Sequence, residues 1–397
     1  MIDLHSILEE QYPEISQVCR TIHENPELSM QEYDTCALLE EKVRANVSFE
    51  RIKRVGETGL FVEVKGRKPG PDRVICLRGD MDALPIQEAQ HHEPRSKKDG
   101  IMHACGHDVH ASALLGAACA LSKCRDMFSG TVYFFFQPAE ETLQGAKLFL
   151  NDPDIDFTNV SGAVAVHVMH SLYAGKVGLK KGPMLAAADE IFVTVRGRSS
   201  HGATPENGVD AIVAQANIIT ALQTLVSRET SPLDNVVLTF GKIKGGTAHN
   251  IIASEVELHG TLRTITKEAR ARMHEAIERV CVNAAAAMGA EAEVRIIAGT
   301  PPLICEDEWV DRACRVAKAA VGEENVVMLE YPGMGGEDFA FIKDRCSGVF
   351  VRIGCRTVGG PFGQSHSPAF YCNPAALKNG IAMLCGIALD FFGEEYR

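Results

Sequence analysis

The sequence TVYFFFQPAEE at residues 131–141 joins an apolar run to two adjacent glutamates. The run does not alternate between apolar and polar residues, so it predicts a strand that is buried on both faces. Such strands belong to parallel sheets covered by helices, and these α/β proteins bind ligands beyond the carboxyl ends of their strands. The stretch therefore predicts an α/β fold with Glu140 and Glu141 at the functional edge of its sheet.

Further strands and helices surround this run. The pattern predicts a helical region in residues 1–50 that Pro26 interrupts, a helix at 111–122, and strands at 60–64, 74–77 and 162–168. Strands that alternate with helices favour a layered α/β fold with a mostly parallel central sheet. The strand at 74–77 leads into the polar segment RGDMD, which places two more carboxylates, Asp80 and Asp82, beyond its end.

The pattern changes near Pro183 and changes back near Pro301. Between them the sequence predicts, in order, a strand, a helix, two strands, a helix and a strand, at residues 191–195, 208–228, 236–240, 255–263, 267–288 and 291–297. This order is that of a small ferredoxin-like α+β sandwich. Because 397 residues exceed what one core normally holds, we expect a larger domain of residues 1–184 and 300–397 and an inserted smaller domain of residues 185–299.

Composition narrows the class of partner. The net charge of -12 argues against nucleic acid and anionic membranes as partners. We expect no membrane span, since no uninterrupted apolar stretch reaches about 20 residues, and the first residues lack the pattern of a secretion signal. The 13 cysteines are odd in number, scattered and without a CxxC pair, so we expect no disulfide framework or zinc ribbon and a reducing cytoplasm.

Four segments combine metal-ligand residue types with predicted strand ends. They are HACGHDVH at 103–110, QPAEE at 137–141, His167 at the end of the strand 162–168, and SHSP at 365–368. Three of them have ordinary alternatives: a hydrogen-bonded structural histidine at 167, a solvated pair of glutamates at 140–141, and a capped turn before a helix at 103–110. Their shared position favours a metal site, because thiolate, imidazole and carboxylate together bind metals such as zinc.

Nine segments resemble one family of enzymes closely. They are HENPEL at 23–28, RGDMDALP at 78–85, HACGHD at 103–108, QPAEE at 137–141, HGATP at 201–205, NII at 250–252, GTLR at 260–263, GEDF at 336–339 and SH at 365–366. They resemble, in order and over nearly the whole chain, the aminoacylase/carboxypeptidase family of dinuclear metallohydrolases. The match is to its branch of hippurate hydrolases, N-acetyldiaminopimelate deacetylases and auxin-conjugate hydrolases.

The resemblance implies a site with two divalent metal ions, which could be zinc, manganese, cobalt or nickel. Its expected ligands are Cys105, His107, Glu141, His167 and His366. Cys105 stands where other members bridge the two metals with an aspartate, and a thiolate can also bridge.

The resemblance also implies the roles of three further acids. Glu140 is expected to be the general base that takes a proton from a metal-activated water and gives it to the leaving amine. On an extended backbone the side chains of Glu140 and Glu141 would diverge, one to the water and one to the metals. Asp80 or Asp82 is expected to orient a ligand histidine; the alignment can be drawn both ways, and we favour Asp80 slightly.

In the predicted smaller domain, the resemblance makes His201 a donor to the scissile carbonyl, acting from the partner subunit of a homodimer. Asn250 and Arg263 become candidates for binding the substrate carboxylate, while a turn residue and a surface charge remain the alternatives for His201 and Arg263. The expected activity is cleavage of the amide bond of an N-acyl amino acid. A dipeptidase or carboxypeptidase, and a non-enzymatic metal- or peptide-binding protein, remain alternatives.

Overall fold

The computed structural model describes residues 2–89 and 93–396 and divides the chain into two compact units. The larger unit comprises Met1–Gly182, Ile304–Tyr331 and Glu337–Arg397, and the smaller unit comprises Pro183–Leu303 and Pro332–Gly336. The segment Pro332–Gly336 lies against the smaller unit, where the backbone N–H of Ala186 donates to the carbonyl of Gly333 at 3.1 Å.

A mixed sheet forms the centre of the larger unit. Its eight strands lie in the order β1-β2-β4-β3-β5-β14-β6-β13. Their bounds are β1 Arg51–Val55, β2 Gly59–Lys65, β3 Val74–Asp80, β4 Thr131–Gln137, β5 Val160–Tyr173, β6 Val177–Leu179, β13 Val326–Met328 and β14 Gly348–Arg356. The central neighbours β4, β3, β5 and β14 pair in parallel, which confirms the predicted α/β class with a mostly parallel sheet.

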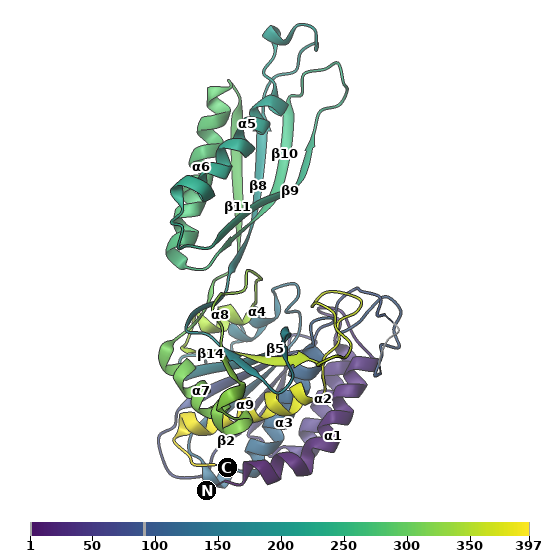
Figure 1. The fold of residues 1–397 in the computed structure, drawn as a ribbon, viewed down its shortest axis with the longest axis vertical. Coiled ribbons are helices and arrows are strands. Elements are labelled where there is room, and N and C mark those ends of the chain that lie inside the picture. The colour runs from purple at the N-terminus through teal and green to yellow at the C-terminus, as the bar shows by residue number, and fades with distance from the viewer. Residues whose placement is uncertain (1, 90–92, 397) are drawn as a thin grey trace. The chain divides into compact units, whose positions relative to one another are not determined.

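Helices cover both faces of this sheet. The bounds are α1 Leu4–Glu24, α2 Tyr33–Asn46, α3 His107–Lys123, α4 Gly145–Leu150, α7 Asp307–Val321, α8 Phe339–Lys343 and α9 Ala375–Phe392. Helices α3 and α9 pack on one face, with α1 outside α3, while α4 and α8 lie on the other face (Figure 1). The two ends of the chain meet beside this layer, where Ile2 forms a β-bridge with Tyr396.

Two strands differ from the sequence-based expectation. The strand predicted at 162–168 continues to Tyr173, because β14 stays paired with it as far as Arg356. His167 therefore lies inside β5 and not at its end. Strand β1 was not predicted, because its sequence, RIKRV, carries the charges of an edge strand and shows little apolar pattern.

The smaller unit is a four-stranded antiparallel sheet with two helices on one face. Its strands β8 Ala187–Arg196, β9 Val236–Gly245, β10 Glu255–Thr264 and β11 Glu291–Thr300 lie in the order β11-β8-β10-β9, and its helices are α5 Ala211–Thr224 and α6 Lys267–Ala287. A single apolar cluster fills the space between helices and sheet. This is the predicted ferredoxin-like arrangement. The short strands β7 Gly182–Leu185 and β12 Leu303–Cys305 lie where the chain passes between the units.

Helix α9 is long and apolar enough to cross a membrane by length and composition alone. However, 72% of this stretch is buried inside the protein, where it packs against α3, α7 and the sheet. Its apolar composition is therefore explained by its place in the core of the larger unit.

We predict that Phe135→Ala lowers the free energy of unfolding by about 3–5 kcal/mol, because it removes a fully buried aromatic ring. The Phe135 ring has no exposed surface and stacks on Phe149 with centroids 4.5 Å apart. Urea denaturation measures the change, and Met127→Ala, at a residue that is 40% exposed, is the control with an expected change of at most about 0.5 kcal/mol. A loss below about 1 kcal/mol for Phe135→Ala would contradict the burial that the structure assigns to β4.

Candidate metal centre

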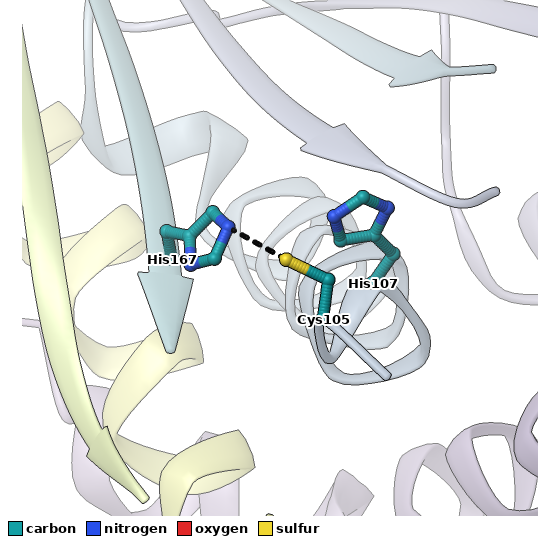
Figure 2. Close-up of side chains that lie close together, drawn as sticks. All are labelled: Cys105, His107 and His167. Carbon is teal, nitrogen blue, oxygen red and sulfur yellow. Dashed lines mark hydrogen bonds between the residues drawn. The ribbon is translucent and has the colours of Figure 1, made fainter. Parts of the chain in front are cut away.

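A tight turn before α3 positions two of the expected ligands. Gly106 lies between Cys105 and His107 with a φ of 87°, and a Cβ at this position would lie 2.5 Å from Cγ2 of Val168. Glycine is therefore required both by conformation and by space. The turn directs the Cys105 thiol and the His107 ring toward the end of the sheet, where they face His167 of β5 (Figure 2).

The His167 side chain presents one nitrogen to this thiol. Its Nδ1 lies 2.7 Å from the carbonyl oxygen of Val168, which can only accept, so Nδ1 carries the proton. Nε2 is then free of a proton and lies 3.5 Å from Sγ of Cys105. A ring that donates through one nitrogen and offers the other is the arrangement that metal-binding histidines use.

The two glutamates lie in a turn, and the expected extended backbone is wrong. Ala139 adopts a φ of 53°, which bends the chain directly after β4 and Pro138. The backbone N–H groups of Glu140 and Glu141 then both donate to the carboxylate of Asp82, at 3.1 and 3.0 Å. Their side chains are separated by this turn, and Glu140 is the more deeply buried of the two.

His366 reaches the same place from the loop between β14 and α9. Its backbone N–H donates to the carbonyl of Ala104 (2.8 Å), which ties the loop to the turn before α3. Its Nε2 lies 3.3 Å from Oε1 of Glu141. The residue has a φ of 61°, a left-handed conformation that a non-glycine residue adopts at a cost of about 1–3 kcal/mol and that is frequent at functional sites.

The five expected ligands form two overlapping groups. Cys105, His107 and His167 make one group and Cys105, Glu141 and His366 the other, each with ligand atoms within 4.8 Å of one another. Cys105 belongs to both, which is the geometry that a bridging thiolate needs.

One buried atom shows that this set suits a metal. Nε2 of His107 is fully buried and has no hydrogen-bond partner among the described residues, although carboxylate oxygens of Asp80, Glu140 and Glu141 lie 3.8–3.9 Å from it. A buried nitrogen without a partner is costly, and a cation held by these sulfur, nitrogen and oxygen donors would satisfy it.

The structure favours Asp82 over Asp80 as the acid that orients His107. Asp82 Oδ1 lies 3.1 Å from Nδ1 of His107, so a proton on Nδ1 leaves the lone pair of Nε2 available to a metal ion. Asp80 instead accepts from Nδ1 of His110 at 2.6 Å, and Nε2 of His110 accepts from the backbone N–H of Val168 at 2.8 Å. The slight preference for Asp80 therefore gives way to separate contacts for the two acids: Asp82 contacts His107, and Asp80 contacts His110.

A buried network of charged residues around Arg78, near Glu140, was not assigned a role from the sequence. Arg78 is fully buried and donates to Gln137 (3.0 Å), Glu337 (2.9 Å) and Asp338 (2.9 Å), and also to Asp80. Burial raises the pKa of Glu140 well above its usual range, and the nearby Glu337 carboxylate adds to the effect. Both parts of this network were visible in the sequence: Arg78 follows an apolar run, and Glu337 and Asp338 belong to the GEDF segment.

His23 of the HENPEL segment contacts Asp108, in the first turn of α3, and Glu88. His23, at the end of α1, lies with Nδ1 2.9 Å from Asp108 and Nε2 3.2 Å from Glu88. Burial alone would lower the pKa of His23, but these two carboxylates raise it to about 10. The resulting ion pair fixes α1 against the first turn of α3.

The remaining candidates lie in the smaller unit. His201 is exposed, forms a β-bridge with Ile251, and accepts from the N–H of Ala203 at Nδ1 (3.0 Å). The neighbouring Gly202 N–H donates to the carbonyl of Asn250 (2.8 Å), so His201 and Asn250 occupy one loop region. Arg263 is partly buried on β10, and burial lowers its pKa.

Comparison with known proteins is consistent with this geometry. The sequence profile of Peptidase family M20/M25/M40 matches residues 76–390, which includes every candidate ligand. The chain belongs to this family. Its members of known structure include a dinuclear metal-binding peptidase of the M20 family from Bacillus subtilis, which is 31% identical, covers 98% of this chain and 100% of its own, and superimposes with a TM-score of 0.84.

Curated M20 relatives are similar over most of their length. An N-acetylcysteine deacetylase of Bacillus subtilis (strain 168) is 38% identical over 94% of each chain. A thermostable carboxypeptidase 2 of Saccharolobus solfataricus is 32% identical over 95% of each chain. This M20 chain is therefore a metal-dependent hydrolase with a two-unit architecture shared across the family.

We predict that Asp82→Asn lowers metal affinity by about 10- to 100-fold, because the side chain loses its charge and one of its two acceptor oxygens, so it can no longer accept from His107 and from both backbone N–H groups of the turn at once. Metal titration of the apoprotein, followed by elemental analysis, measures the change. Asp80→Asn is the comparison: it leaves the His107–Asp82 contact intact and should lower stability more than metal affinity. Equal metal affinity in Asp82→Asn and the unmodified protein would refute the assignment of Asp82.

Proposed function

We propose that this protein cleaves the amide bond of N-acyl amino acids with Glu140 as the general base. The observation that carries the proposal is the place of Cys105 in both ligand groups beside the buried Glu140. Two divalent metal ions would be held by Cys105, His107, Glu141, His167 and His366. The mixed donor set suits zinc, manganese, cobalt or nickel.

The residues of the chain divide the chemical work. When bound, the divalent ions supply Lewis acidity that polarises a carbonyl and makes a water molecule acidic near neutral pH. Glu140 takes the proton of the attacking water and passes it to the leaving amine. Asp82 accepts from the backbone N–H of Glu140 at 3.1 Å, which holds the backbone of the turn that carries the base.

The named activities of relatives favour an N-acyl substrate. The Bacillus subtilis relative is named for removing the acyl group of N-acetylcysteine, and the Geobacillus stearothermophilus relative, 39% identical over 73% of this chain, is named an N-acyl-L-amino acid amidohydrolase. The carboxypeptidase relative supports peptide cleavage as the second candidate. A purely metal- or peptide-binding role is less well supported, because a binder has no need of Glu140.

The smaller unit would supply substrate contacts. His201 would donate to the carbonyl oxygen that becomes negative in the transition state. Asn250 and Arg263 would hold the substrate carboxylate, for which the planar guanidinium of Arg263 is suited.

A homodimer through the smaller units would place His201 of one copy at the site of the other. Strand β9 lies at an edge of its sheet, so the described residues leave one side of it unpaired. Exposed apolar residues accompany this edge, namely Ile243 on β9 and Ile212 and Val213 on α5. We place the dimer in the cytoplasm, since all thirteen cysteines are free.

We predict that the protein, loaded with manganese or zinc, hydrolyses N-acetyl or N-benzoyl amino acids faster than dipeptides. Glu140→Gln should keep its metal and lose turnover by several orders of magnitude, because only the base is removed. Cys105→Ala should lose metal, as elemental analysis would show. Hydrolysis that favours dipeptides would support the peptidase, and near-normal turnover in Glu140→Gln would eliminate the base assignment.

We also predict that mixed dimers of Glu140→Gln and His201→Ala subunits regain part of the activity that each variant lacks alone. One of the two sites in such a dimer would combine an intact Glu140 with an intact His201 from the other copy. Differently tagged subunits allow the hybrids to be purified and assayed. Absence of recovery in verified hybrids would show that His201 acts within its own chain or has no catalytic role.

A further inference from the structure

Arg352 lies beside the candidate metal centre on the strand next to His167. It occupies β14, and in the parallel pairing of β14 with β5 its register partner is His167. Side chains of register partners in a parallel pair project from the same face of the sheet. Arg352 therefore projects from the same face as the candidate ligand His167.

Ring contacts connect the guanidinium with the candidate ligand His167 through Phe350. Its central carbon lies 5.4 Å from the centroid of the Phe350 ring, and this ring lies 5.8 Å from that of His167. Cys105, Glu337 and Glu140 are near enough to favour the charged form of Arg352. Burial opposes them and lowers the pKa of Arg352 below its usual value.

Within the described residues, Arg352 forms no hydrogen bond and no ion pair, although it is only partly exposed. Arg78, on β3 of the same sheet, shows how this chain otherwise buries a guanidinium, with bonds to three carboxylates and an amide. Apart from the contact with the Phe350 ring, the partly buried charge of Arg352 has neither a hydrogen bond nor an ion pair among the described residues, which lowers stability. The cost is greater beside ligands that would bring two further cations to the site.

We propose that Arg352 binds a carboxylate of the substrate beside the metal centre. This inference rests on the proposed function and adds a specificity-determining residue to it. A planar guanidinium pairs with a carboxylate through two parallel N–H donors. The position on β14, one strand beyond His167, lets Arg352 hold an anionic group without displacing a metal ligand. The carboxylate can belong to the side chain of the amino acid or to the far end of the acyl group; if it is the α-carboxylate, Arg352 takes the role proposed above for Arg263.

Three matched substrate pairs separate these sources. N-acetyl-L-alanine and its α-carboxamide test the α-carboxylate. N-acetyl-L-glutamate and N-acetyl-L-glutamine test the side chain, and N-succinyl-L-alanine and N-butyryl-L-alanine test the acyl group. The specificity constant kcat/KM is measured for the unmodified protein, Arg352→Met and Arg352→Lys, with metal content recorded for each. Arg315→Met is the control, because Arg315 is exposed on α7 and pairs with Asp390 at 3.1 Å.

We expect Arg352→Met to lower kcat/KM by about 10- to 100-fold for the carboxylate member of one pair and to change its neutral member little. The kcat/KM of Arg352→Lys for that carboxylate substrate should lie between those of the unmodified protein and Arg352→Met, since lysine keeps the charge and loses the two parallel N–H donors of the guanidinium. Metal content should be unchanged in both. A binding measurement by calorimetry, in the Glu140→Gln background, should show the same selective loss without turnover.

An equal change within every pair overturns the proposal, whether the change is large or absent. A uniform loss accompanied by loss of metal would make Arg352 a structural support of Cys105. If the unmodified protein hydrolyses none of the six compounds, the proposed function fails. The Arg352 proposal is then tested only by comparing the calorimetric affinities of the unmodified and Arg352→Met proteins for the two members of each pair. If none of them binds either, the Arg352 proposal fails as well.

Discussion

The carboxylate of Asp82 accepts hydrogen bonds from three separate segments of the chain, and the candidate site is built around it. The donors are Nδ1 of His107, the hydroxyl of Ser29 at 2.7 Å, and the backbone N–H groups of Glu140 and Glu141. These bonds lower the pKa of Asp82 despite its complete burial, which alone would raise it. One acid thus holds the candidate ligand His107 and the backbone of Glu140 and Glu141, the proposed base and a candidate ligand, so a small shift at Asp82 would move all three.

A second buried network sets the charge around that frame. Arg78 balances Asp80, Glu337 and Asp338, and these acids come from two segments 257 residues or more apart in sequence. Removing one member of such a network leaves an unpaired buried charge, which costs about 3–5 kcal/mol. The network therefore ties β3 of the central sheet to Glu337 and Asp338 of the GEDF segment.

The sequence predicted those parts of the fold that depend on local pattern. The run at 131–136 fixed β4, and the order of elements between residues 191 and 297 identified the ferredoxin-like unit. The failures have physical causes. The strand containing His167 was predicted too short because its outer half is partly exposed and polar, and its pairing with β14 is a long-range contact. Asp80 and Asp82 lie two residues apart, and only the three-dimensional position of His110 and His107 separates their roles.

The same difference between local pattern and long-range contact explains which site residues could be found from the sequence. Motifs with ligand chemistry, such as HACGHD, are visible as residue types, whereas Arg352 is visible only as one charge within the apolar run VFVRIG. A charge in such a run has two explanations, a partner elsewhere in the chain or a ligand. The sequence could not distinguish them, because it does not show which partners the fold brings near.

The candidate ligands come from segments as far apart as Cys105 and His366, yet backbone contacts hold them together without relying on an ion. The N–H of His366 bonds to the carbonyl of Ala104, and Gly106 turns the chain between Cys105 and His107. The His167 ring is oriented by the carbonyl of its neighbour Val168. Because the candidate ligands His107, Glu141, His167 and His366 are each held by a hydrogen bond that a metal does not supply, the chain can present a nearly complete donor set on folding. A bound metal would then satisfy buried atoms such as Nε2 of His107. Little of its binding free energy would be needed to bring distant segments together.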